Sequence, residues 1–271
     1  DFNTTAGTNT LTVGTVGSTT GGIQLFSPTN GEHWINWGDT NSSTGRYMGR
    51  IGYNHTDNKL MFYSSGTQKM VIDSSGQVGI GGINPGQTLE IHNSNASDYT
   101  DFGLRGTGHK YVIGVGNDSV ATVNDKWYLY DNDNTAFRMV VDTSGNVGIG
   151  TTTPGAMLDI KGNTTTYGGM AKIYLTDSNS NSESRNWAIG NGGSGYGHFT
   201  IGRSNSKDGD PMASGTHTVP FMIDHQDNVG IGMTPTPAVG APLQIASSGT
   251  GYVGLRLNGS GSAGVWDLYS S

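Results

Sequence analysis

Carboxylates are the residues of this sequence that could do the most chemistry. Three aspartates recur at one place in a repeated string, at Asp73, Asp142 and Asp224. Each could be a Ca²⁺ ligand or a catalytic group, but one carboxylate per repeat lacks the oxygens that Ca²⁺ requires. We therefore interpret them as turn residues whose carboxylates accept backbone N–H bonds.

Glycoside hydrolysis would need two carboxylates at a set separation. The chain has only three glutamates, at the non-equivalent positions Glu32, Glu90 and Glu183, and its close aspartate pairs are typical of solvated loops. Carboxylates of neighbouring chains could still pair, so a polysaccharide depolymerase stays an alternative. We predict that the chain is not an enzyme and has no catalytic residue and no cofactor.

Metal-ligand spacing is also missing from the sequence. The stretch Asp131–Asp142 has the length of an EF-hand loop, but it lacks the required Gly and Glu and no helices flank it. There is no cysteine, and the seven histidines show no H-x-H or H-E-x-x-H spacing. One histidine per chain, such as His225, could share a metal on a symmetry axis, but we predict no metal site.

Aromatic residues are densest around Trp34, Trp37 and Tyr47. Aromatic faces suit pyranose rings, so this group could bind a sugar. Trp34 corresponds in the repeat to Trp187 and Trp266, which favours a role in the module core. Trp37 has no repeat counterpart, so Trp37 and Tyr47 are the residues we predict to bind a ligand.

The composition excludes several classes of protein. Gly accounts for 45 of 271 residues, hydrophobic residues for 33%, and the formal net charge is -7. The acidic balance without Lys/Arg clusters argues against nucleic-acid binding. No apolar run is long enough for a transmembrane helix. So little apolar material in an ordered chain indicates that some burial comes from neighbouring chains.

The chain is a repeat, and a twelve-residue string occurs three times in the same phase. It reads MVIDSSGQVGIG at 70–81, MVVDTSGNVGIG at 139–150 and FMIDHQDNVGIG at 221–232. In a strand, the valine and isoleucine of each VGIG segment share one face, while the glycines leave the other face bare. A bare face lets another backbone approach closely. We interpret the segments as narrow necks packed between chains by Val78, Ile80, Val147, Ile149, Val229 and Ile231.

The remaining sequence consists of short runs of alternating apolar residues bounded by Gly, Asn, Asp and Ser, a pattern typical of strands joined by turns. We expect an all-β fold of tandem small β modules joined by VGIG necks and intertwined in a homotrimeric fibre. The expected units are 1–10 (the end of a preceding unit or a linker), 11–88, 89–157, 158–242 and a partial fourth repeat, 243–271. Because the fourth repeat stops soon after Trp266, we expect the chain to be cut from a longer protein.

The string D-(S/T)-S-G-(Q/N)-V-G-I-G-x-x-x-P, followed by Leu-x-Ile, resembles the repeated element of tail-fibre and tail-spike proteins of tailed bacteriophages. Similar repeats occur in large bacterial surface proteins, and they often precede a self-cleaving chaperone domain that these residues do not contain. The resemblance covers roughly Leu11 to Ser271. It implies a homotrimeric β-rich fibre on a virion or cell surface that binds host carbohydrate or protein.

We therefore expect a structural, non-catalytic segment of a virion tail fibre, used for reach and host-surface attachment. Its expected partners are two copies of itself, other fibre or tail proteins and a host surface glycan or protein, with no nucleic acid and no membrane insertion. Its expected location is the virion or an extracellular surface. A secreted bacterial filament or adhesin built from the same repeats is the first alternative, and the depolymerase is the second.

Overall fold

The structure is a computed structural model of the 271-residue chain. It describes residues 25, 28–82, 84–162, 170–192, 195–213, 217–235 and 242–246, and the backbone alone of 253–257 and 266–270. The expected first unit, 1–10, lies outside the described residues. The chain forms two compact units, one of residues up to 101 together with 116–120, and one of the remaining residues.

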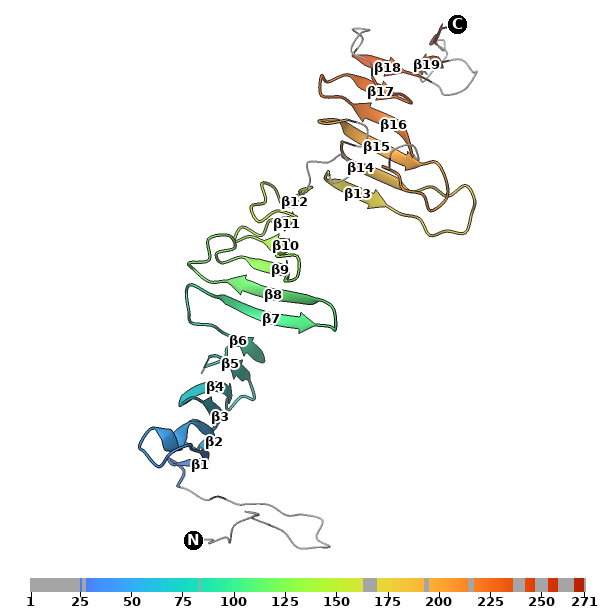
Figure 1. The fold of residues 1–271 in the computed structure, drawn as a ribbon. Helices are drawn as coiled ribbons and strands as arrows, with labels where there is room; N and C mark the ends of the chain where they lie inside the picture. The colour runs from blue at the N-terminus through green and yellow to red at the C-terminus, as the bar shows by residue number, and fades with distance from the viewer. Residues whose placement is uncertain are drawn as a thin grey trace. The chain divides into compact units, whose positions relative to one another are not determined.

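The all-β prediction is confirmed. The described residues contain eighteen strands in three six-stranded sheets, plus one two-stranded hairpin, and no α-helix (Figure 1). The one helical turn among the described residues is a 3-10 turn, η1, at Gly45–Tyr47. No described segment forms a helix with the length and apolar character needed to cross a membrane.

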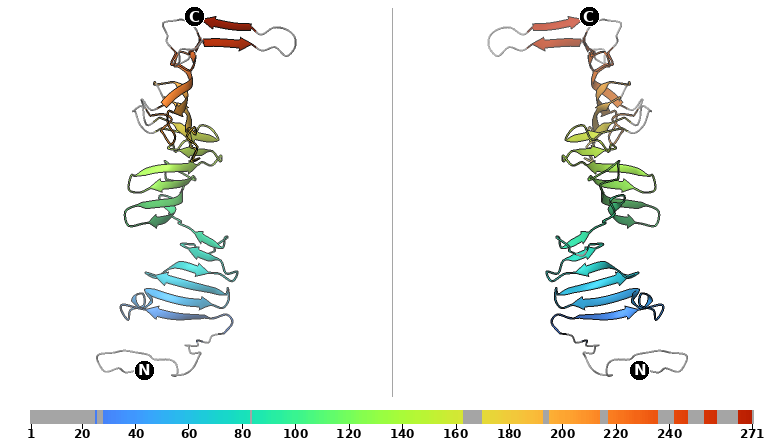
Figure 2. Two further views of the ribbon diagram at one scale, coloured as in Figure 1. Left: turned by 90° about the vertical axis from the view of Figure 1, so that its right-hand side faces the viewer. Right: turned by 90° about the vertical axis from the view of Figure 1, so that its left-hand side faces the viewer.

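In the first sheet the strands lie side by side in sequence order, from β1 to β6 (Figure 2). The strands are β1 Glu32–Trp37, β2 Gly49–Asn54, β3 Lys59–Ser64, β4 Thr67–Ile72, β5 Val78–Ile80 and β6 Leu89–Ile91. Each pair is antiparallel except the last, β5 with β6, which is parallel.

The second and third sheets repeat this order and again end on a parallel pair. The second consists of β7 Tyr99–Arg105, β8 Lys110–Gly116, β9 Trp127–Asp131, β10 Ala136–Val141, β11 Val147–Ile149 and β12 Leu158–Ile160. The third consists of β13 Lys172–Leu175, β14 Trp187–Asn191, β15 Phe199–Ser204, β16 His217–Ile223, β17 Val229–Ile231 and β18 Leu243–Ile245. The hairpin is β19 Val253–Leu257 with β20 Trp266–Ser270.

The VGIG segment is thus the fifth strand of each sheet, and the following Leu-x-Ile segment is the sixth. The sequence-based boundaries of the repeats fall between these two strands, which the structure pairs in one sheet. A parallel pair usually needs a crossover of a dozen or more residues, whereas residues 81–88 suffice here. Gly81 makes the short connection possible for two reasons. Its φ is 80°, which favours glycine, and a Cβ at this position would lie 2.0 Å from the carbonyl oxygen of His92.

One face of each sheet is covered by the chain itself. In the first sheet a cross-strand row on this face runs through four buried residues, Gly52, Met61, Val71 and Gly79. The loop after β5 lies on Gly79, since a Cβ there would be 2.8 Å from the Gly82 oxygen. The corresponding buried rows are Gly114–Tyr128–Val140–Gly148 and Thr200–Met222–Gly230. Their final glycines, Gly148 and Gly230, are likewise covered by the loop that follows them.

Candidate assembly interface

The opposite face of each sheet is apolar and open in the single chain. In the first sheet one cross-strand row crosses all six strands without a polar residue: Ile35, Ile51, Phe62, Met70, Ile80 and Ile91. Ile35 at one end of this row is 50% exposed, and Ile80 is 42% exposed. A soluble chain rarely leaves so continuous an apolar row in water.

The same row recurs in the other two sheets. It is Ile113–Leu129–Met139–Ile149–Ile160 in the second sheet and Ile173–Ile189–Ile201–Phe221–Ile231–Ile245 in the third. Since neighbouring strands lie about 4.8 Å apart, a six-residue row is about 24 Å long. Three sheets therefore present three long apolar rows of nearly identical composition.

The six residues predicted to pack between chains all lie on these open faces. Ile80, Ile149 and Ile231 are members of the three rows, and Val78, Val147 and Val229 lie two residues earlier on the same strands. The glycines between them point to the covered face, where the backbone that approaches belongs to the same chain. The glycines are thus explained by close packing against a loop of the same chain. Only the face that carries the valines and isoleucines stays available to a neighbouring chain.

The recurring aspartates are turn residues, as the sequence predicts. Asp142 Oδ1 accepts hydrogen bonds from the backbone N–H groups of Ser144 and Asn146, at 2.9 and 2.8 Å. Asp73 and Asp224 make the same pair of bonds two and four residues along.

Those hydrogen bonds favour the charged carboxylate. The N–H of Asn146 lowers the pKa of Asp142, and the side-chain amide of Asn228 does the same for Asp224, in each case against the effect of burial. These carboxylates therefore stabilise the turn in front of the VGIG strand.

A cluster that the sequence did not predict lies at the start of β8 and the end of β9. Asp131 is 2% exposed and accepts hydrogen bonds from Arg138 Nε at 3.0 Å and Asn134 Nδ2 at 2.9 Å. His109 lies with Nε2 2.8 Å from Asp131 Oδ1 and Nδ1 3.3 Å from Asp133 Oδ2. The sequence drew attention to Asp131 only as the first residue of a stretch of EF-hand length. It gave no signal for His109, which the pairing of β9 with β8 brings beside Asp131.

His109, Asp131 and Asp133 are the described residues that could hold a metal ion, since their ligand atoms lie within 4.8 Å of one another. The geometry fits an ion-pair network better. The two ring nitrogens of His109 face different carboxylates, and Arg138 already neutralises Asp131. Burial raises the pKa of Asp131, but the hydrogen bonds from Arg138, Asn134 and His109 outweigh it and hold that pKa well below its usual range.

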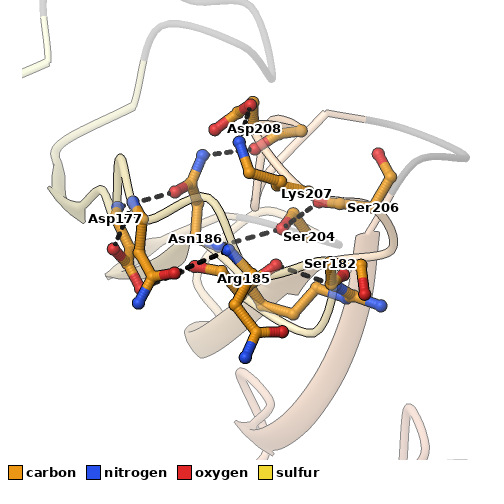
Figure 3. Close-up of polar contacts among 12 residues, drawn as sticks. Asp177, Ser182, Arg185, Asn186, Ser204, Ser206, Lys207 and Asp208 are labelled. Atoms are coloured by element: carbon orange, nitrogen blue, oxygen red, sulfur yellow. Dashed lines mark hydrogen bonds and ion pairs between the residues drawn. The ribbon is translucent and has the colours of Figure 1, made fainter.

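A second polar network joins two long loops of the third sheet (Figure 3). Asn186, just before β14, donates from Nδ2 to the Gly209 oxygen at 2.9 Å and accepts from the Asp177 N–H at 2.9 Å. It also exchanges bonds with Ser204, whose hydroxyl receives the Asn186 N–H at 3.0 Å. Because Asn186 and Ser204 are buried, these bonds fix the loops 176–186 and 205–213 to the sheet.

The two predicted ligand residues are placed on different faces of the first sheet. Trp37 is 54% exposed and lies with Ile35 on the open apolar face. The ring of Tyr47, in η1, lies 5.8 Å from the Arg50 guanidinium, and Arg50 is paired with Asn36 on the covered side. The structure therefore does not combine Trp37 and Tyr47 into one platform.

Two of the three glutamates considered for catalysis have structural side-chain contacts. Glu32 accepts from Trp34 Nε1 at 3.1 Å and from Asn54 at 2.8 Å. Glu90 accepts from the Gly86 N–H at 2.8 Å, and Asp159 makes the equivalent bond to Gly155 at 3.0 Å. The polar residue of two Leu-x-Ile strands thus holds the loop that precedes it.

No protein-family model matches the chain, and no curated protein is significantly similar to it.

Proposed function

We propose that this chain is a structural segment of a homotrimeric fibre, used for reach and for attachment to a host surface. The observation that carries the proposal is the continuous apolar row on the open face of every sheet. Each row is partly exposed in one chain, and every other copy of the chain carries the same row, which could cover it. Neighbouring chains would supply the burial that the 33% hydrophobic content of one chain cannot provide.

Three chains around an axis would bury three open faces together, while the covered faces and their loops stay outside. The number three comes from the resemblance of the VGIG repeats to those of bacteriophage tail fibres. A virion tail fibre is accordingly the origin we propose, with a virion or extracellular location. Attachment would work through avidity, because three identical chains present each surface three times.

Light scattering of the 271-residue chain tests the assembly. We expect a mass three times the 28.4 kDa of the chain. A mass of one or two chains would contradict the threefold arrangement. In the case of one chain, it would also show that the open rows remain in water.

A further inference from the structure

Arg50 on the covered side of the first sheet lies among aromatic rings and has no anionic partner. Its guanidinium carbon is 4.3 Å from the Tyr63 ring centroid and 4.6 Å from that of Trp34. Trp34 and Tyr63 are themselves edge-to-face at 5.3 Å. Such contacts stabilise a cation, but they provide no acceptor for its N–H groups.

In this respect Arg50 differs from Arg138 and Arg46, although the Nε of Arg203 is likewise buried without a hydrogen-bond partner. Arg138 pairs with Asp131, and Arg46 donates to the backbone oxygen and side chain of Asn41. No described carboxylate lies within ion-pair distance of Arg50, and its Nε is buried without a hydrogen-bond partner. Because this Nε has no contact with solvent, an external anion would have to bind the terminal nitrogens of the guanidinium, which make no ion pair with a described carboxylate.

The groups around Arg50 define what that partner should carry. Cross-strand pairing places the exposed Asn36 on one side of Arg50 and Tyr63 on the other. Tyr47, which is 39% exposed, adds a third ring at 5.8 Å. A guanidinium binds a carboxylate through two parallel N–H bonds. Aromatic faces pack against the C–H face of a sugar ring, and the Asn36 amide can reach a hydroxyl.

The loop that carries Tyr47 is built to hold it there. Gly38 packs so closely that a Cβ on it would lie 2.6 Å from the Arg46 Cα. Asp39 N–H donates to the Gly45 oxygen at 3.1 Å, and Tyr47 N–H donates to the Thr44 oxygen at 3.3 Å. The aromatic wall is therefore preformed, which lowers the entropic cost of binding.

From this geometry we infer that Arg50, Asn36, Tyr47 and the rings of Trp34 and Tyr63 form a binding site for an acidic saccharide. The sugar carboxylate binds the guanidinium, and the ring rests on the aromatic side chains. The inference rests on the proposed role in host-surface attachment, for which it names a ligand class. Trp37 takes no part, because it lies on the opposite face of the sheet.

Saturation-transfer NMR on the whole chain tests the site with sialyllactose and a galacturonic acid trimer as acidic probes and lactose as the neutral one. We expect both acidic probes to bind at least tenfold more tightly than lactose, and Arg50→Gln to weaken them at least tenfold. Arg105→Gln is the matched control, because it removes the same charge from an exposed position. It should bind like the wild type.

Two further variants guard against a folding artefact. Tyr47→Ala changes only the loop and should weaken both acidic probes while leaving the circular dichroism spectrum unchanged. Arg50→Lys keeps the charge, loses the two-pronged donor and should also weaken them. Equal binding of lactose and the acidic probes, normal binding by Arg50→Gln, or no binding at millimolar probe would overturn the site. If Arg50→Gln instead lowers the mass of the assembly, the partner of Arg50 is a neighbouring chain and the saccharide site is wrong. The mass of the wild type reports separately on the proposed fibre.

Discussion

Ile149→Asp is the substitution that tests the open apolar face most directly. Ile149 is the last residue of the β11 strand and is 43% exposed in the single chain. Complete burial of an isoleucine contributes about 1.5–3 kcal/mol, so covering its exposed part contributes about 1 kcal/mol per chain. The new carboxylate would cost several kcal/mol more for each chain if it were buried at an interface.

The sum over three chains decides the outcome. Even about 2 kcal/mol per chain is about 6 kcal/mol per trimer, or roughly four powers of ten in the assembly constant. We therefore expect light scattering to give the mass of one chain, while circular dichroism still shows a β-rich spectrum. Thr122→Asp, which adds the same charge at an exposed turn, should keep the mass of the wild type.

A variant Ile149→Asp chain with the mass and melting temperature of the wild type would refute the reasoning. It would mean that this face stays in water in the assembly. Ile149→Ala grades the effect, because it removes burial without adding charge, and it should weaken assembly less than the aspartate.

Three further predictions concern the single chain. Gly230→Ala would place a Cβ 2.4 Å from the Met233 oxygen and should lower the unfolding free energy by about 1–3 kcal/mol in thermal melts, whereas Gly108→Ala, in open space, should change it little. The melting temperature should decrease when the pH is lowered below about 4. The folded state lowers the pKa of Asp142 and Asp224, so these carboxylates stabilise the fold above their unfolded-state pKa and lose that contribution as the pH falls through their folded-state pKa. Asp142→Asn should make the decrease of the melting temperature at low pH smaller. An unchanged decrease would contradict a stabilising role for the Asp142 carboxylate. Asn186→Ala should cost about 1–3 kcal/mol and speed proteolysis of the loops 176–186 and 205–213, unlike Ser180→Ala at an exposed site.

Much of the fold could be predicted from the sequence because the signals are local. Alternating apolar residues between turn residues indicate strands, and no described segment contradicts this. The recurring aspartates were predicted as turn residues because their bonds reach only two and four residues along the chain. The bare glycine face of VGIG was also predicted to admit a close backbone.

Which backbone packs on the VGIG glycines could not be predicted, because it depends on the pairing of strands and not on neighbouring residues. Only the structure shows that the loop after each VGIG strand covers the glycines, and that the Leu-x-Ile strand closes the same sheet in parallel. Only the cross-strand register brings His109 to Asp131, 22 residues apart, and sets Arg50 beside Tyr63.

The sequence by itself therefore determined the strands, the turns and the face to which each side chain points, since these depend on alternation and on neighbouring residues. The tertiary structure decided which face the chain covers and which it leaves open. That choice depends on contacts between residues far apart in the sequence, and from it follow both the open apolar rows and the site around Arg50.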